Sequence, residues 1–184
     1  MNHEDRVLIE RELKSGESLL WSGKPRAGVY LKSSDTFMIP FSLLWGGFAL
    51  FWEYSAYKMG APFFFLLWGI PFILAGLYII FGRFFVEASV RKRTWYGVTS
   101  ERVIIISGFF KRSVRSVNIK ALGELSLAEK RNNFGTITLG QMPPFSNWMQ
   151  SGLPGIGKAN VPQLEMVPNA RSVYDTILNI QKGA

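Results

Sequence analysis

The chain has 184 residues, 48% of them hydrophobic, a formal net charge of +8 and no cysteine. The lack of cysteine excludes a disulfide framework and thiolate chemistry, and a single histidine near the N-terminus excludes histidine-based metal sites and nucleophile–base pairs. The 21 Lys and Arg residues are dispersed, and no motif of a nucleic-acid-binding module is present. We therefore expect no cofactor, no metal site and no nucleic-acid partner.

The N-terminal part of the chain precedes its first long apolar run. Residues 3–14 predict a short helix that is solvated or lies on a surface, followed by strand pieces around Leu19–Trp21 and Val29–Leu31. We do not expect a cleaved signal peptide, because the chain opens with charged residues and its apolar run begins only at residue 36. Residues 1–35 are predicted to form a cytoplasmic N-terminal segment.

A long, almost uncharged stretch follows in residues 36–82. Its only charged residues, Glu53 and Lys58, divide it into two apolar runs, Thr36–Trp52 with 17 uncharged residues and Met59–Gly82 with 24. The hydrocarbon core of a bilayer is about 30 Å thick, and a helix of about 20 apolar residues crosses it. Burying both runs in a soluble protein would require a larger core than the rest of this chain can supply.

We therefore predict a transmembrane hairpin at residues 36–82, with spans at about 36–54 and 61–82 joined by a short polar loop. Six Lys and Arg residues precede the hairpin and fourteen follow it, against one in the connecting loop. By the positive-inside rule, both termini then lie in the cytoplasm and the protein is a multi-pass membrane protein. We expect no ionisable group at bilayer depth, which argues against a pump or carrier.

Beyond the hairpin, the periodicity changes from helical to short runs separated by turn residues. After a helical continuation to about residue 93, the runs have the spacing of an antiparallel barrel or sandwich. Residues 168–182 carry apolar side chains at helical spacing and predict an amphipathic helix that covers one end of it. We predict an α+β membrane protein with a cytoplasmic domain at residues 83–184. The expected strands are residues 94–99, 102–107, 112–118, 124–130, 135–140 and 162–168.

Three stretches carry a resemblance to a known family. Residues 95–119, WYGVTSERVIIISGFFKRSVRSVNI, are similar to the first hairpin and third strand of the bacterial pleckstrin-homology-like (bacterial PH domain) membrane proteins. GESLLWSGKP at residues 16–25 and LEMVPNARSVYDTIL at residues 164–178 resemble the beginning and the strand-plus-helix ending of that family. The resemblance implies a PH-like antiparallel β-barrel capped by a C-terminal helix, held at the membrane, with no established enzymatic activity.

The resemblance does not imply phosphoinositide binding, because the basic loop of the eukaryotic lipid-binding domains is replaced here by the short connection Thr99–Arg102. We expect a non-enzymatic binding or assembly module that contacts the bilayer and a protein partner or a second copy of itself, without a small-molecule substrate. The alternative is a sensor of anionic lipid head groups. The basic residues that would contact lipid are Arg83, Arg91, Lys92, Arg93, Lys111, Arg112 and Arg115.

A long segment, residues 141–161, separates the last two predicted strands. It is rich in apolar residues and has one charged residue, a composition unlike that of a disordered linker. Three roles remain open for it: additional core, contact with the membrane interface, or docking of a partner. Within it, residues 152–158 have the spacing of a phosphate-binding loop but lack the following Ser or Thr and helix, so we predict no nucleotide site. The candidate contact residues are Phe145, Trp148 and Met149.

Overall fold

The computed structural model describes residues 3–29, 35–108, 112–130, 132–141 and 161–183. They form two compact units. The β unit combines the N-terminal segment up to Gly28 with most of the chain from Ala88 onward, and the hairpin unit contains Val29–Glu87. The N-terminal segment, predicted from the sequence as a part of its own, thus folds with the C-terminal part of the chain.

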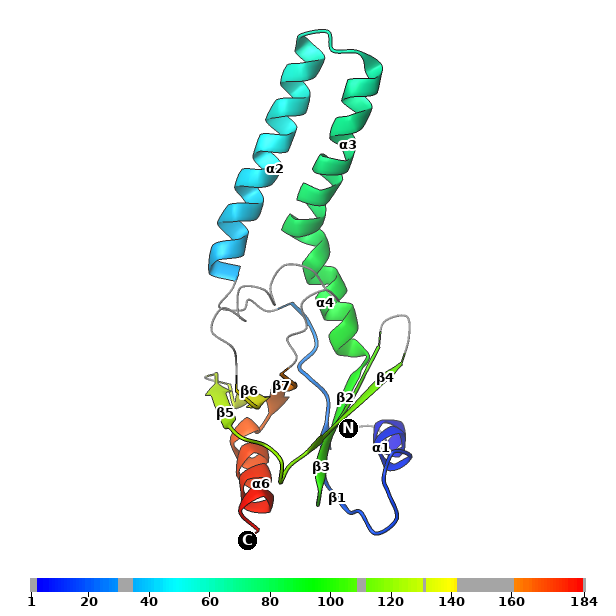
Figure 1. Cartoon of the computed structure of the whole chain (residues 1–184), viewed down its shortest axis with the longest axis vertical. Coiled ribbons are helices and arrows are strands. Elements are labelled where there is room, and N and C mark those ends of the chain that lie inside the picture. The colour runs from blue at the N-terminus through cyan, green and yellow to red at the C-terminus, as the bar shows by residue number, and fades with distance from the viewer. Residues whose placement is uncertain (1–2, 30–34, 109–111, 131, 142–160, 184) are drawn as a thin grey trace. The chain divides into compact units, whose positions relative to one another are not determined.

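The hairpin unit is built from helix α2 (Asp35–Lys58) and helix α3 (Phe63–Leu77), which lie antiparallel and side by side (Figure 1). A π-helical turn, η1 (Tyr78–Gly82), and helix α4 (Arg83–Lys92) follow α3 without a break. The two continuous helical segments have 24 and 30 residues and are long and apolar enough to cross a membrane. The predicted helical continuation beyond residue 83 is confirmed.

The first helix ends later than predicted. We expected it to end near residue 54, but α2 continues to Lys58 because the polar patch contains no Gly or Pro before Gly60. Gly60 has a φ of 72°, and its amide and the next one hydrogen-bond back to carbonyl groups of the last turn. This is a Schellman motif, which favours glycine at the left-handed position. Glu53 therefore lies inside α2 and inside the first candidate span, with more than one helical turn after it.

The two helices meet along small residues. Gly46 of α2 lies opposite Gly76 of α3, and a Cβ atom added to Gly76 would come 3.1 Å from the Cα atom of Gly46. The missing side chains let the two backbones approach closely, as is common between membrane helices. The buried residues of α2 recur at three, four or seven positions, so they share one face. They are Asp35, Met38, Ser42, Gly46, Ala49 and Ala56.

The remaining surface of the hairpin is apolar and uncovered by the described chain. In the most apolar window of each helical segment, only 28% and 11% of the residues are buried. Phe48, Phe51, Phe64 and Trp68 are between 62% and 78% exposed. A core helix of a soluble protein would bury most such side chains. The hairpin thus requires an apolar environment that the described part of the chain does not supply.

A buried ion pair joins the two helical segments at the end where the chain enters and leaves the hairpin. Asp35 begins α2 and Arg83 begins α4, and Asp35 Oδ1 lies 2.9 Å from Arg83 Nη2. Only 8% and 2% of these side chains are exposed. The guanidinium of Arg83 also lies 4.5 Å from the ring centroid of Phe84. Because a buried charge is costly unless it is paired, this contact fixes which helix ends lie together.

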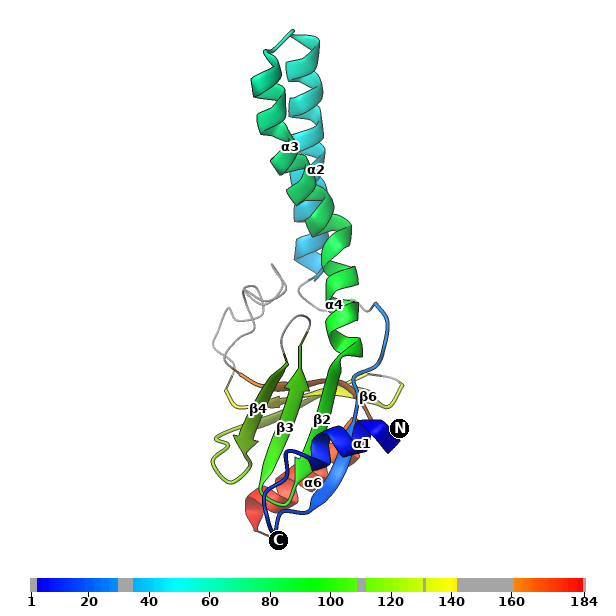
Figure 2. The ribbon, with the colours of Figure 1, turned by 90° about the vertical axis from the view of Figure 1, so that its right-hand side faces the viewer.

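The β unit contains two antiparallel sheets (Figure 2), with strand orders β1-β2-β3-β4 and β5-β6-β7. All six strands predicted after the hairpin are present, with bounds within one residue of those expected, and the strand piece predicted near Leu19 is β1. The strands are β1 (Leu19–Gly23), β2 (Thr94–Thr99), β3 (Arg102–Ser107), β4 (Ser113–Asn118), β5 (Leu125–Glu129), β6 (Phe134–Leu139) and β7 (Gln163–Pro168).

The predicted PH-like β-barrel is not a closed barrel, because the two sheets remain separate. Strands β4 and β5 follow one another in the chain without pairing, and the edge strands β1 and β7 share no ladder. Instead, the amide of Arg26, beyond the end of β1, donates one hydrogen bond of 2.9 Å to the carbonyl oxygen of Met166 in β7. The spacing of strands in the sequence does not distinguish a barrel from two packed sheets, because both require the same alternation of inward and outward residues.

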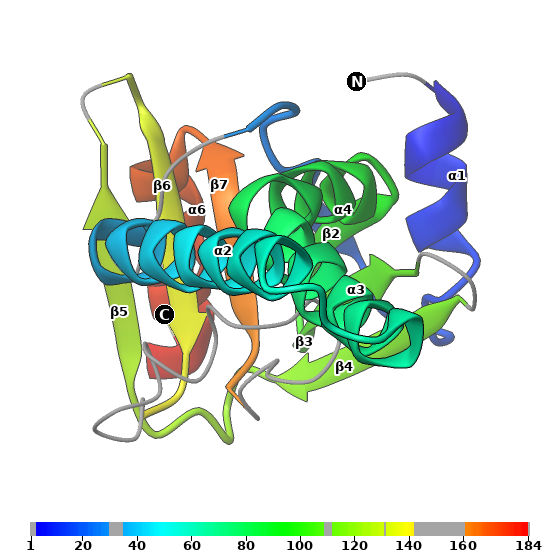
Figure 3. The same ribbon diagram turned by 90° about the horizontal axis from the view of Figure 1, so that it is seen from above.

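The main core lies between the sheets and is completed by helix α6 (Ala170–Lys182), as predicted. Val173 and Ile177 of this helix are buried in one cluster with strand residues such as Val98 and Ile137. Figure 3 shows α6 against the sheet of β5, β6 and β7, and the contacts of the helix with β5 and β6 agree. The amphipathic pattern therefore predicted both the helix and the surface that it covers.

Helix α1 (His3–Glu10) packs on the opposite face of the first sheet. Ile9 is 1% exposed and contacts Ile104 and Ile106, whose side chains alternate along β3 with those that face the main core. Gly97 of β2 makes room for it, since a Cβ atom there would lie 2.5 Å from Ile9 Cγ2. The helix is thus docked through Ile9 rather than solvated. The sequence did not reveal this because its apolar stripe is only partial.

The ion pair predicts a coupled response to substitution. Arg83→Met would leave Asp35 buried without its partner and should lower the free energy of unfolding of the full chain by about 3–5 kcal/mol. The double variant Asp35→Leu/Arg83→Met should lose much less than the sum of the single variants. Unfolding of the purified protein in mixed micelles, followed by circular dichroism, measures these values. Lys92→Met is the exposed control, and additive losses in the double variant would contradict the coupling.

Candidate membrane-facing and partner-facing site

The basic residues predicted to contact lipid fall into two groups. Arg83 in the hairpin unit and Arg91 in the β unit are only 2% and 5% exposed. The others that the structure describes lie at the surface of the β unit, and Lys111 lies outside the described residues, as do the loop residues Phe145, Trp148 and Met149. Those at the surface are Lys92, Arg93, Arg112 and Arg115.

The side chain of Arg91 makes a contact within the β unit. It lies in the last turn of α4, and its Nη2 donates a hydrogen bond of 3.0 Å to the carbonyl oxygen of Gly28. Its neighbours Lys92 and Arg93 point in other directions around the helix end and are exposed. The basic triplet predicted as one lipid-contacting group is therefore divided between an internal contact and the surface.

Strand β4 and the residue before it form a basic, exposed surface, which we call the β4 edge (residues 112–118). Among the described residues, β4 pairs only with β3, and five of its six residues are exposed. Arg115 lies on the strand, and Arg112 forms an ion pair of 2.8 Å with Glu12, with both side chains partly exposed. Such a pair contributes about 0–1 kcal/mol and is easily exchanged for another acidic group. An unpaired strand edge can also accept an added strand, so the β4 edge is the candidate partner-facing surface.

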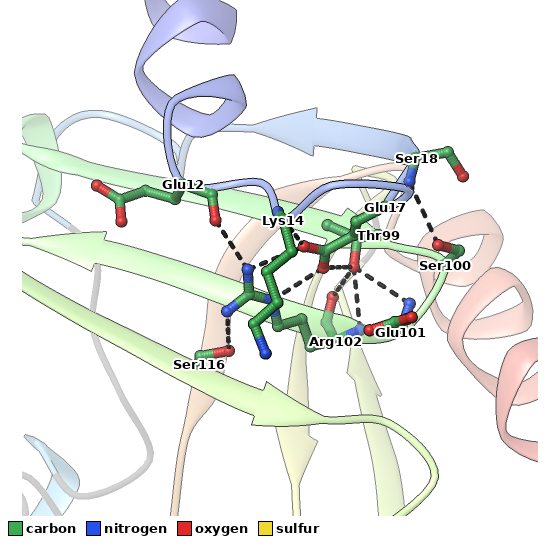
Figure 4. A network of polar contacts seen from close by, with 9 residues as sticks. All are labelled: Glu12, Lys14, Glu17, Ser18, Thr99, Ser100, Glu101, Arg102 and Ser116. Carbon is green, nitrogen blue, oxygen red and sulfur yellow. Dashed lines mark hydrogen bonds and ion pairs between the residues drawn. The ribbon is translucent and has the colours of Figure 1, made fainter.

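A polar network ties the N-terminal segment to the turn between β2 and β3 (Figure 4). The carboxylate of Glu17 accepts hydrogen bonds from Nε and Nη2 of Arg102, each 2.8 Å long, and one of 2.6 Å from the hydroxyl of Thr99. Nη2 of Arg102 also donates to the carbonyl oxygen of Glu12 over 2.8 Å. The Thr99 hydroxyl oxygen accepts bonds from the amides of Glu101 and Arg102. This two-pronged, charged contact is of the strong kind.

The network shifts the ionisation of both charged groups. Hydrogen bonds from Arg102 are the main cause that lowers the pKa of Glu17 to about 2, and they outweigh its burial, which acts in the opposite direction. The same contact raises the pKa of Arg102. Nothing in the sequence pointed to this pair, because its members are 85 residues apart and the whole hairpin lies between them in the chain.

A second polar contact joins the two sheets. Tyr96 of β2 is 3% exposed, and its hydroxyl oxygen accepts a hydrogen bond of 3.2 Å from the amide of Glu165 in β7. The next residue, Met166, has a φ of 47°, which bulky residues rarely adopt, and its amide donates to the hydroxyl of Thr136. Burial raises the pKa of Tyr96, so its hydroxyl stays protonated at neutral pH. Because the pairing of β7 with β6 is irregular between Leu164 and Val167, the amide of Glu165 bonds to Tyr96 of the first sheet.

These contacts hold the fold together and do not form a catalytic set. In the part of the chain that the structure describes, no group of three His, Cys, Asp or Glu side chains is placed to hold a metal ion. With its lowered pKa and its bonds to Arg102 and Thr99, Glu17 is a poor proton acceptor at neutral pH. The chemistry that the described surface offers is recognition, through exposed cations and a free strand edge.

Comparison with protein-family models gives a match over most of the chain. Residues 46–180, more than half of the protein, match the model described as "Bacterial PH domain". The chain belongs to the bacterial PH domain family. The family assignment begins inside α2 and ends in α6, so it takes in most of the described hairpin as well as the two sheets. It confirms the resemblance drawn from the sequence motifs. No curated protein and no solved structure matches the chain.

The Glu17 network predicts a loss of stability on neutralisation. Glu17→Gln keeps the shape of the side chain but leaves the Arg102 guanidinium, of whose side chain 17% is exposed, without its counter-charge. We expect the free energy of unfolding of the β unit to fall by about 3 kcal/mol. Denaturant titration of the full chain in detergent, followed by tryptophan fluorescence, measures it. The exposed Glu124→Gln is the matched control and should change stability by less than about 0.5 kcal/mol.

The same titration at several pH values tests the electrostatic cause. Because the folded pKa of Glu17 is lowered, its stabilising contribution is complete above the unfolded value of 4.5 and is lost as the pH falls toward about 2. The stability difference between the natural chain and Glu17→Gln should therefore shrink over this range. A difference that is constant with pH would show that the carboxylate charge is not the cause.

Proposed function

We propose that this protein is a membrane-anchored binding or assembly module, without enzymatic activity, at the cytoplasmic face of the bacterial inner membrane. The observation that carries the anchoring is the hairpin surface, since two helical segments of 24 and 30 residues leave most of their apolar side chains uncovered. A bilayer is the apolar environment that fits two such helices. Membership of the bacterial PH domain family supports the binding role.

The orientation in this proposal rests on charge. The turn between α2 and α3 has Lys58 as its one basic neighbour, whereas twenty of the 21 Lys and Arg residues lie in the chain before or after the two apolar runs. Lys92 ends the second helical segment, Arg93 follows it, and both residues are exposed. Positive charge close to the spans is retained on the cytoplasmic side, which supports the proposal that the β unit lies there.

A specific observation favours a second candidate function, a sensor of anionic lipid head groups. The cations Lys92, Arg93, Arg112 and Arg115 are exposed on the β unit. Near an anionic membrane each such cation contributes about 1 kcal/mol of attraction, which falls as salt screens it. The binding-module proposal assigns the β4 edge to a protein partner or a second copy of the chain, and the sensor proposal assigns it to lipid.

A photoreactive amino acid at position 114 separates these two functions. Val114 is 43% exposed on β4, so a probe there reports what covers the β4 edge in isolated membranes. We expect adducts with another protein or with a second copy of the chain. Position 179 on α6, also exposed, is the control and should give fewer adducts. Adducts with phospholipid alone, decreasing as salt rises, would contradict the binding module and support the sensor.

A further inference from the structure

Glu53 occupies the face of α2 that packs on α3. The buried residues of α2 include Ser42, Gly46, Ala49 and Ala56. Glu53 lies four residues after Ala49 and three before Ala56, so it shares their face of the helix. Its side chain reaches across to Gly69 of α3, where an added Cβ atom would overlap with Glu53 Oε2. A carboxylate thus stands in a row of otherwise small residues between two apolar helices.

One oxygen of this carboxylate is buried and unpaired. Oε2 of Glu53 has no hydrogen-bond partner among the residues that the structure describes. At the other end of the same face, Asp35 is paired with Arg83 at 2.9 Å. The burial of Oε2 raises the cost of a charge on Glu53, and a cation or hydrogen-bond donor that reaches the rest of the carboxylate from outside the described chain would lower it.

The side chain opens onto a groove on the surface of the hairpin. The groove has a volume of about 340 Å³ and is lined by Leu50, Glu53, Tyr54, Tyr57, Leu66 and Ile73. Five residues of helix, about 7.5 Å, separate Glu53 from the last residue of α2. The polar head-group layer on each side of a bilayer is about 5–7 Å thick, so the carboxylate lies close to the boundary between head groups and acyl chains.

A positive charge lies beside this groove. The Nζ atom of Lys58 is 5.7 Å from the ring centroid of Tyr54, a groove residue. Glu53 and Lys58 are the only charged residues between Asp35 and Arg83 in the sequence. The groove therefore combines one negative group, one positive group and an apolar wall, which is the charge pattern that complements a zwitterionic lipid.

We propose that this groove binds a phospholipid with a primary amine in its head group, at the leaflet opposite the β unit. The ammonium group donates hydrogen bonds to Glu53, the phosphate lies toward Lys58, and an acyl chain follows Leu50, Leu66 and Ile73. This site rests on the proposed membrane anchoring and adds a specific lipid to it. It differs from the anionic-lipid sensor, which uses the cations of the β unit.

The test measures lipid retention by the full chain. The protein is purified in detergent and titrated with phosphatidylethanolamine or phosphatidylglycerol, and native mass spectrometry counts the bound lipids. We expect phosphatidylethanolamine to bind about tenfold more tightly, as a hydrogen bond to a buried charge would give. Glu53→Gln should remove this preference. Gly69→Ala should also remove this preference. The substitution leaves the carboxylate of Glu53 chemically intact, but the new methyl group would overlap with its Oε2 atom and displace it.

Two control variants make the outcome specific. Lys58→Gln should weaken the binding of both lipids equally, because both carry the phosphate. Glu124→Gln in the β unit should leave the retention of both lipids unchanged. Equal retention of the two lipids by the natural chain, or an unchanged preference in Glu53→Gln, would overturn the site. A chain that stays in solution without detergent would instead overturn the membrane anchoring itself, so the two failures are distinguishable.

Discussion

The buried ion pair between Asp35 and Arg83 is the constraint on which the hairpin depends. Two apolar helices can slide along one another at little cost, since most of their side chains find similar surroundings at many offsets. A paired charge reduces this freedom, because any offset that separates Asp35 from Arg83 breaks a buried contact between opposite charges. The approach of Gly46 to Gly76 adds a steric condition at the same register. The ion pair at one end of the hairpin and the small residues along the helix contact together specify a single packing of α2 on α3.

The hairpin is an insertion between two neighbouring strands of the β unit. β1 and β2 are antiparallel partners, with Gly23 opposite Tyr96, so the chain leaves the sheet and returns to it at adjacent points. The Glu17–Arg102 contact and the bond from Arg91 to Gly28 both join residues before the insertion to residues after it. These contacts let the sheet form across a break of about seventy residues, which no local pattern in the sequence encodes.

Local signals predicted much of the fold. Alternation, turn residues and the amphipathic pattern of α6 gave the strands and the closing helix, because each depends on neighbours in the chain. Sheet closure, the docking of Ile9 and the Glu17 network depend on distant partners and were not predictable in this way. Glu53 is an intermediate case. Its spacing from Ser42, Gly46 and Ala49 is visible in the sequence, but its place in the polar patch at the end of the predicted span gave no sign that it shares their helical face.

The central claim is a membrane hairpin whose two ends lead to a cytoplasmic β unit, and the absence of cysteine from the chain allows a direct test. Lys58→Cys places a single thiol at the end of α2, and Lys182→Cys places one in α6. Labelling of spheroplasts with a membrane-impermeant maleimide measures which thiol is outside. The account predicts labelling of Lys58→Cys in intact spheroplasts and of Lys182→Cys only after permeabilisation. Labelling of both before permeabilisation, or of Lys182→Cys alone, would contradict it.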